Sequence, residues 1–266
     1  MPPIMTKCDP TRLLLKLALF MAISMSVYAQ GRGGRGGPPP PPATPKAAAP
    51  TDLTGYWVAV VVEDWRYRML PPAKFEQTPA LGARVNLPMN AEARKIALAW
   101  DPAKDEAAGE QCRAYGAPNL MRIPGRIHIT WQDDQTLKLE SDAGTQTRLL
   151  EFGATKNSGG GWQGVSTAAW EVVGAGRGGP VLSGSLKIVT SKLKPGYLQK
   201  NGIPYSANAT VTEFFDRVDE QGDSSYLVVT STVDDPVYLT EPYLTSTHFK
   251  KEADASGWKP SPCSSR

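Results

Sequence analysis

The stretch RIHITWQDDQTLKLE, residues 126–140, decides the fold class. Apolar residues from Ile127 to Trp131 alternate with polar ones, a polar turn follows, and Leu137 and Leu139 resume the alternation. Alternation with a period of two on both sides of a polar turn is typical of a β-hairpin. We therefore expect the chain around this stretch to form an antiparallel sheet.

Similar segments on both sides of the hairpin predict further strands. They cover residues 58–62, 145–153, 162–173, 181–191, 209–217, 225–233 and 243–251. About eight or nine short strands with regular spacing imply a barrel or a sandwich. The sequence predicts a mainly β fold, a single antiparallel barrel.

A helical pattern interrupts the strands before the hairpin. Asn90 can cap a helix whose apolar stripe runs from Ala93 to Trp100 at spacings of three and four residues. Asp101 followed by Pro102 is typical of the start of a second short helix. We expect a short helical insert after the first strand.

The first fifty residues indicate export. Residues 1–29 combine basic residues, an uncharged apolar run at 17–27 and a small-x-small site before Gln30, which is the pattern of a secretory signal peptide. Residues 30–50 are rich in glycine and proline and predict a disordered linker. We expect a barrel domain at residues 51–263, a tail at 264–266, and a periplasmic or secreted protein.

Charge, strand composition and cysteine content bear on the possible partners and on a disulfide. Without the three basic and one acidic residues of 1–29, the chain carries 26 basic and 25 acidic residues, which provides no electrostatic reason to bind nucleic acid. Polar residues on the strands, such as Thr210 and Asp216, break the apolar band that membrane insertion would need. Loss of Cys8 leaves Cys112 and Cys263, which predicts a disulfide, with two free thiols as the alternative.

Acid–base chemistry is the strongest enzymatic hypothesis. Glu213 alternates with Val211 and Phe215, so it shares a face with apolar groups. A carboxylate there either pairs with a cation such as Arg148 or has a raised pKa and can act as a general base. The competing interpretation is a structural ion pair such as Glu140 with Arg148.

Two histidines could assist such a base. His128 and Glu140 lie on strand faces that are solvated if the barrel is dry and that line the lumen if it is polar. His248 lies on the last predicted strand, and no spacing of the two histidines suggests a metal site. Two matches to G-x-G-x-x-G, at Gly31 and Gly174, lack the strand–helix context of a dinucleotide site, so we predict no cofactor and no metal.

Aromatic residues spread over the strands are candidates for the wall of a ligand cavity. With the polar residues beside them, the candidate ligand-binding set is Trp131, Ser166, Trp170, Glu171, Tyr205 and Phe215. The connection at 194–205, with its turn-forming residues and two tyrosines, is a candidate lid.

The sequence also resembles known barrels. Gly55-x-Trp57, at the start of the first strand, resembles the entry motif of lipocalin-like (calycin) barrels. In that family the Trp closes one barrel end under a basic side chain of the last strand, which implies Lys250 or Lys251 for this role.

A second resemblance covers most of residues 100–250. Glu140 with Arg148, Gly164-x-Ser166-x-x-x-Trp170-Glu171 and Asp235-Pro236 are similar to segments of secreted bacterial proteins of unassigned function. This likeness implies no activity.

Three functions follow as hypotheses. The first is a lipocalin-like protein that binds a small apolar or aromatic molecule in a barrel cavity. The second is a small cofactor-independent lyase, isomerase or hydrolase that uses Glu213 or Glu140 as base, with His128, His248 or Arg148 assisting. The third is an envelope interaction protein without a ligand, and the oligomeric state is open in all three.

Overall fold

A computed structural model describes residues 43–61, 87–156, 159–174, 183–220 and 224–265. The predicted signal peptide, residues 30–42 of the predicted linker and most of the second glycine-rich match lie outside these ranges. None of the helices within them is long and apolar enough to cross a membrane.

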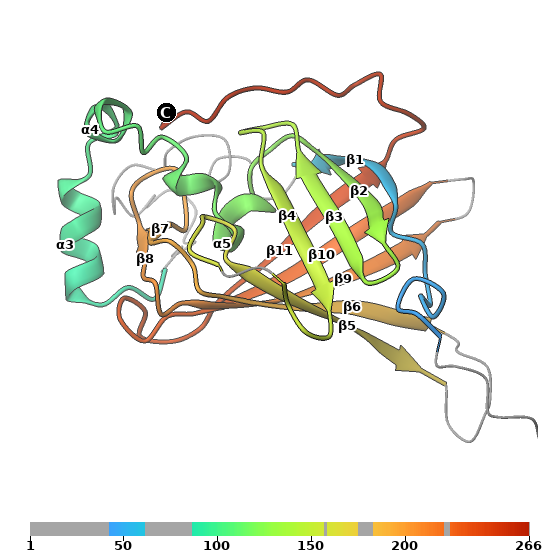
Figure 1. Ribbon diagram of the computed structural model, residues 1–266. Helices are drawn as coiled ribbons and strands as arrows, with labels where there is room; N and C mark the ends of the chain where they lie inside the picture. The colour runs from blue at the N-terminus through green and yellow to red at the C-terminus, as the bar shows by residue number, and fades with distance from the viewer. Residues whose placement is uncertain (1–42, 62–86, 157–158, 175–182, 221–223, 266) are drawn as a thin grey trace, which may run out of the picture. The chain divides into compact units, whose positions relative to one another are not determined.

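Nine strands close into a barrel in the order β1-β11-β10-β9-β6-β5-β4-β3-β2 (Figure 1). They are β1 (Gly55–Val60), β2 (Arg126–Asp133), β3 (Thr136–Ser141), β4 (Thr147–Phe152), β5 (Val165–Val173), β6 (Ser183–Ser191), β9 (Thr210–Asp219), β10 (Ser225–Asp234) and β11 (Tyr243–Lys251). The other elements within the described ranges are α3 (Ala91–Ala99), α4 (Pro102–Ala107), the 3₁₀ helix η2 (Arg113–Tyr115), α5 (Ala117–Leu120) and the short strands β7 (Gly196–Tyr197) and β8 (Pro204–Tyr205). The predicted mainly β barrel is confirmed.

The barrel departs from the prediction at one joint. Strands β4 and β5 are parallel, with Leu150 opposite Ser166 and Phe152 opposite Ala168, so the expectation of an antiparallel barrel is wrong there. Parallel neighbours need a crossover of about a dozen residues, whereas a tight hairpin always produces antiparallel strands. Residues 153–164 provide a connection of that length.

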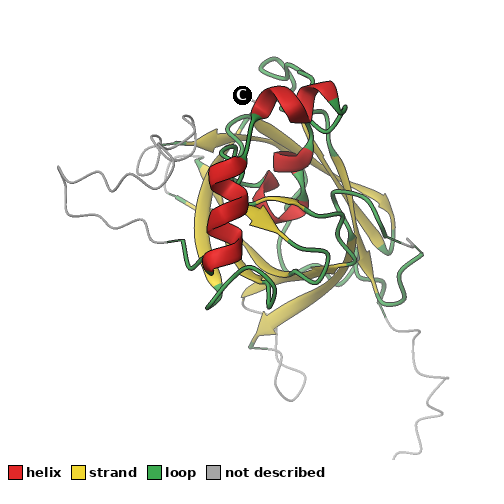
Figure 2. Ribbon diagram, turned by 90° about the vertical axis from the view of Figure 1, so that its left-hand side faces the viewer, coloured by secondary structure: helices red, strands yellow, loops and turns green. Residues whose placement is uncertain are grey.

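The helical insert begins where the caps predict. The side chain of Asn90 accepts a hydrogen bond from the Ala93 N–H at 2.9 Å, and that of Asp101 accepts one from the Ala103 N–H at 3.0 Å. Helix α3 ends at Ala99, so Trp100 is its C-cap rather than part of the helical stripe. Both helices lie over one end of the barrel (Figure 2).

Trp57 closes a core of apolar residues inside the barrel. Its side chain is fully buried, and its indole N–H donates to the Leu53 carbonyl at 3.0 Å. Lys251 Nζ lies 4.5 Å from the Trp57 ring centroid and donates to the Thr54 carbonyl. Burial lowers the pKa of Lys251. The predicted basic partner of Trp57 is therefore Lys251, while Lys250 is exposed.

A second apolar cluster fills the helical end of the barrel. The segment at 194–205, predicted as a lid, forms β7 and β8, and its Leu198 and Tyr205 are fully buried. They pack in one cluster with Ala97 of α3 and Val211 of β9. These apolar side chains belong to the core, and the lid stays a prediction.

Residues of the predicted linker contact the barrel. The Trp170 indole N–H donates to the Pro45 carbonyl at 2.8 Å, and the Lys46 N–H donates to the Asp134 carbonyl at 3.3 Å. The described chain therefore lies against the barrel before β1 begins.

A disulfide joins Cys112 to Cys263, as predicted, across a sequence separation of 151 residues. The tail is also held by the Ser261 N–H, which donates to the Asp142 carbonyl at 2.9 Å, and by the Thr145 hydroxyl, which donates to the Ser261 carbonyl at 2.9 Å. The disulfide thus fastens Cys263 to the start of η2, and the hydrogen bonds of Ser261 hold the same segment against the turn after β3.

Removal of the disulfide should destabilise the protein strongly. The double variant Cys112→Ser/Cys263→Ser should lower the free energy of unfolding by about 3–5 kcal/mol, because closing so long a loop restricts the unfolded chain. Urea unfolding measures this, with and without reductant. Reductant should destabilise the wild type equally and leave the double variant unchanged; a wild type that is insensitive to reductant would contradict the role of the bond.

Candidate functional site

The centre of the barrel holds a buried ion pair. Arg148 of β4 donates two hydrogen bonds to Glu213 of β9, Nη1 to Oε1 at 3.2 Å and Nη2 to Oε2 at 2.6 Å. Both side chains are completely shielded from solvent. Of the two alternatives predicted for Glu213, the structure shows the pairing with Arg148.

Two hydroxyl groups complete this arrangement. Arg148 Nη2 lies 3.2 Å from the Thr190 hydroxyl and 3.5 Å from the Ser166 hydroxyl, and the two hydroxyls are 2.7 Å apart. We call Arg148, Ser166, Thr190 and Glu213 the polar layer. Arg148 Nε is buried without a hydrogen-bond partner among the residues described.

The polar layer separates the two apolar clusters. Along β9, Val211 belongs to the cluster at the helical end and Phe215 to the cluster around Trp57, with Glu213 between them. A buried charge without a partner costs several kcal/mol, so each charged group of the layer depends on the other.

The predicted catalytic residues form two separate pairs rather than one site, Arg148 with Glu213 inside the barrel and His128 with Glu140 on its outer face. His128 and Glu140 lie on the outer face of β2 and β3, with His128 Nδ1 3.6 Å from Glu140 Oε2. Glu140 also contacts Lys138 Nζ at 3.0 Å, so the predicted pair of Glu140 with Arg148 is wrong because the two residues face opposite sides of the sheet. His248 is on the outer face of β11, where it lies beside Val60 and Val228.

His128 belongs to a surface aromatic group. Its ring stacks on Tyr56 with centroids 3.9 Å apart, and Trp258 of the C-terminal tail contacts both rings edge-on. Burial lowers the pKa of His128 from its ordinary value of 6.5. At neutral pH this side chain is therefore mostly an uncharged stacking partner.

The structure brings together only part of the predicted ligand-binding set. Trp131 and Trp170 each contact Phe152, with ring centroids 5.7 Å apart in both cases, and both pack against the cluster that contains Phe215. Glu171 is on the surface, where it pairs with Lys187 at 2.8 Å. Three further members are buried: Ser166 in the polar layer, Phe215 in the cluster around Trp57, and Tyr205 at the helical end.

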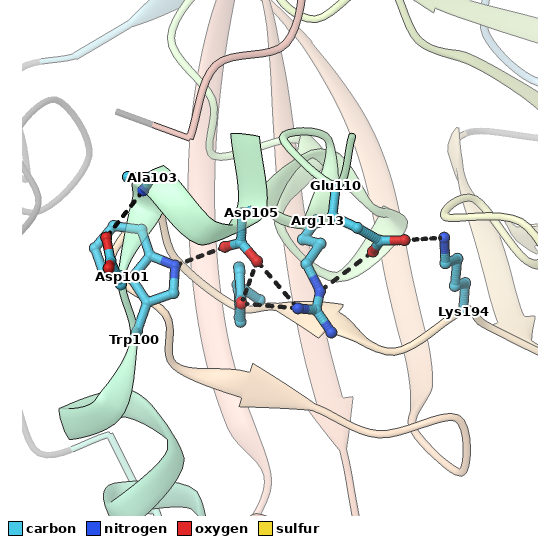
Figure 3. Close-up of polar contacts among 8 residues, drawn as sticks. Trp100, Asp101, Ala103, Asp105, Glu110, Arg113 and Lys194 are labelled. Atoms are coloured by element: carbon cyan, nitrogen blue, oxygen red, sulfur yellow. Dashed lines mark hydrogen bonds and ion pairs between the residues drawn. The ribbon is translucent and has the colours of Figure 1, made fainter. Parts of the chain in front are cut away.

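One polar cluster escaped the sequence reasoning. Asp105 of α4 is buried and accepts hydrogen bonds from Trp100 Nε1 at 2.8 Å, Arg113 Nη1 at 3.1 Å and the Tyr197 hydroxyl at 3.2 Å (Figure 3). Burial raises the pKa of Tyr197 to about 12. No local pattern marks Asp105, because Tyr197 is 92 residues away in the sequence.

This cluster has little room beside it. The cavity that Asp105 and Arg113 line has a volume of about 10 Å³, which is near the smallest space that holds one water molecule. The cluster therefore joins α4, η2 and β7. The cavity beside it is too small to bind an organic molecule. Throughout the described ranges, no three His, Cys, Asp or Glu side chains lie close enough together to hold a metal ion.

Comparisons of the chain with protein-family models, with curated proteins and with solved structures found no match. The function must therefore be argued from the geometry of this chain.

Breaking the buried ion pair should be costly. Glu213→Gln should lower the free energy of unfolding by about 3–5 kcal/mol, because it leaves Arg148 buried and charged without its counter-ion. The control Glu171→Gln breaks the exposed pair with Lys187 and should cost less than about 1 kcal/mol. Urea unfolding of both variants measures the difference.

The double variant Arg148→Met/Glu213→Leu should recover most of the loss, since an apolar pair removes both buried charges. Equal costs for Glu213→Gln and Glu171→Gln would contradict the structural role of the layer.

Proposed function

We propose that this protein is an exported interaction module whose barrel is a filled scaffold and whose partner binds on the outer surface. The observation that carries the proposal is the occupancy of the barrel interior by the protein's own side chains. At most 1% of the surface of each of these inward-facing residues is exposed: Trp57, Ile129, Leu139, Leu150, Leu186, Ile188, Phe215, Leu227, Val229 and Phe249.

A lipocalin-like binding protein needs a cavity where these side chains meet. Ligand pockets for small molecules have volumes of about 300–1,000 Å³ and are lined by convergent polar and apolar groups. Here the large side chains pack together in one cluster, and the polar layer closes the interior above them. The packing supports a scaffold over a carrier of small molecules.

The division of the candidate catalytic residues into two pairs supports the same conclusion. A general base must lie within hydrogen-bond reach of the substrate proton that it removes. Glu213 is shielded from solvent inside the barrel, while His128 and Glu140 lie on its outer face. The separation of Glu213 from the pair of His128 and Glu140 disfavours one acid–base site that uses all three residues.

Export and a distant relationship to lipocalin-like barrels belong to this proposal. The signal-peptide pattern of residues 1–29 and the disulfide between Cys112 and Cys263 support an oxidising, non-cytoplasmic location. The stacking of Lys251 over Trp57, next to Gly55, supports the relationship. In such a protein the closed barrel is retained, but side chains fill the interior where a lipocalin-like barrel holds its ligand.

A cavity-creating variant tests whether the interior is filled. Phe215→Ala should remove about 3–5 kcal/mol of stability and open an apolar cavity. Benzene should then raise the Tm of this variant, because a dry cavity of benzene size binds it. The Tm of the wild type should not change.

Phe214→Ala is the matched control, since Phe214 precedes Phe215 on the opposite face of β9 and its removal leaves no interior space. Native mass spectrometry of the exported protein should show the mass of the mature chain alone. A stoichiometric small molecule, or a benzene-dependent Tm of the wild type, would overturn the proposal.

A further inference from the structure

Strand β5 extends beyond its neighbour β4. The two strands pair at three positions, from Leu150 opposite Ser166 to Phe152 opposite Ala168. After Phe152 the chain turns away at Gly153, which has a φ of 82°. Strand β5 continues to Val173 in antiparallel pairing with β6 and projects past the end of β4 in Figure 1.

Residues 169–173 therefore form a free edge, where β5 has β6 on one side and no strand of the described chain on the other. A five-residue edge is about 16 Å long, and every second residue presents an N–H and a C=O away from the sheet. Natural barrels avoid such edges by closure, and this edge arises because β4 is shorter than β5.

The side chains along the free edge are apolar except at its centre. Val172 is 42% exposed and Val173 is 63% exposed, which is high for branched apolar residues. Trp170 is half-buried beside them, and its indole N–H is already bonded to the Pro45 carbonyl. Glu171 lies in the middle of the edge, and half of its side chain remains exposed although it pairs with Lys187.

We propose that this free edge binds an extended peptide segment of another protein by strand addition. The peptide carries a basic residue opposite Glu171 and apolar residues on either side of it. Backbone hydrogen bonds to an exposed sheet edge supply the affinity, and the alternating side chains supply the selectivity. This inference rests on the proposed function, because it names the class of partner for the outer surface.

The charge of Glu171 favours a basic peptide over a second copy of the chain. Antiparallel pairing of all five edge residues with the same edge of a second copy would place Glu171 opposite Glu171, and like charges directly opposite destabilise a strand pair. A register shifted by two residues avoids this contact but shortens the pairing. A lysine or arginine at that position instead forms a favourable cross-strand pair.

A peptide is free to follow the edge and to contact both Val173 on one face and Val172 on the other.

The probe is the labelled peptide acetyl-Ser-Val-Ile-Lys-Val-Thr-Ser-amide, titrated into the mature protein and followed by fluorescence anisotropy. It should bind saturably with one site per chain. Methylation of alternate backbone nitrogens of the peptide should weaken binding by about tenfold or more, because it removes the ladder donors. Hydrogen exchange should show new protection at residues 169–173.

Charge reversal tests the position of the site. Glu171→Lys should weaken binding of this peptide by about tenfold and should restore binding of a peptide with Glu in place of the central Lys. Glu140→Lys is the matched control. Glu140 lies on β3, away from the free edge, and is also a part-exposed carboxylate that pairs with a lysine, Lys138. This control should leave the affinity unchanged.

Absence of saturable binding, or equal effects of Glu171→Lys and Glu140→Lys, would overturn the inference. Self-association of the wild type that Glu171→Lys changes would also overturn it, by identifying a second copy as the occupant. These outcomes would not contradict the proposal of a filled barrel. A stoichiometric small molecule in the interior would overturn the proposed function itself.

Discussion

The buried pair of Arg148 and Glu213 is the constraint on which the rest of the barrel depends. The pair belongs to the polar layer, whose four polar groups come from β4, β5, β6 and β9. These strands are adjacent in the barrel and include the parallel pair of β4 and β5. A shift of one residue in any of these strands would move its polar group to the outer face. That shift would leave a charge or a hydroxyl buried without partners, so the layer selects the register of four strands at once.

The same layer supports the proposal that the barrel is a filled scaffold. Arg148 and Glu213 are buried as each other's counter-ion, with the hydroxyl groups of Ser166 and Thr190 beside Arg148. Apolar side chains then occupy the space on both sides of the layer. Under that proposal, recognition takes place on the outer surface, and the unequal lengths of β4 and β5 create the edge that we propose for it.

Much of the fold was accessible from the sequence because its signals are local. Alternation predicted the barrel strands, Asn90 and Asp101 predicted both helix starts, and the cysteine count predicted the disulfide. The inward position of Glu213 also followed from its apolar neighbours. These features depend on residues a few positions apart or on simple arithmetic.

The remaining features depend on contacts between distant segments. Strand direction has no local signature, so the parallel joint of β4 and β5 could not be read from residues 145–173. The sequence could not decide whether His128 and Glu140 point inward or outward, because alternation shows which residues share a face but not which face is inside. The segment at 194–205 looked like a lid because its turn-forming residues are visible in the sequence, whereas the burial of Tyr205 against Ala97 and Val211 is not.

A crystal structure of the mature protein under xenon pressure tests the central claim most directly. Xenon enters dry apolar cavities of suitable size, and it reports on the interior without any assumption about the natural ligand. A filled barrel predicts no xenon site among the residues packed around Phe215 and Arg148. A well-occupied xenon atom there would contradict the filled scaffold and return the barrel interior to consideration as a binding site.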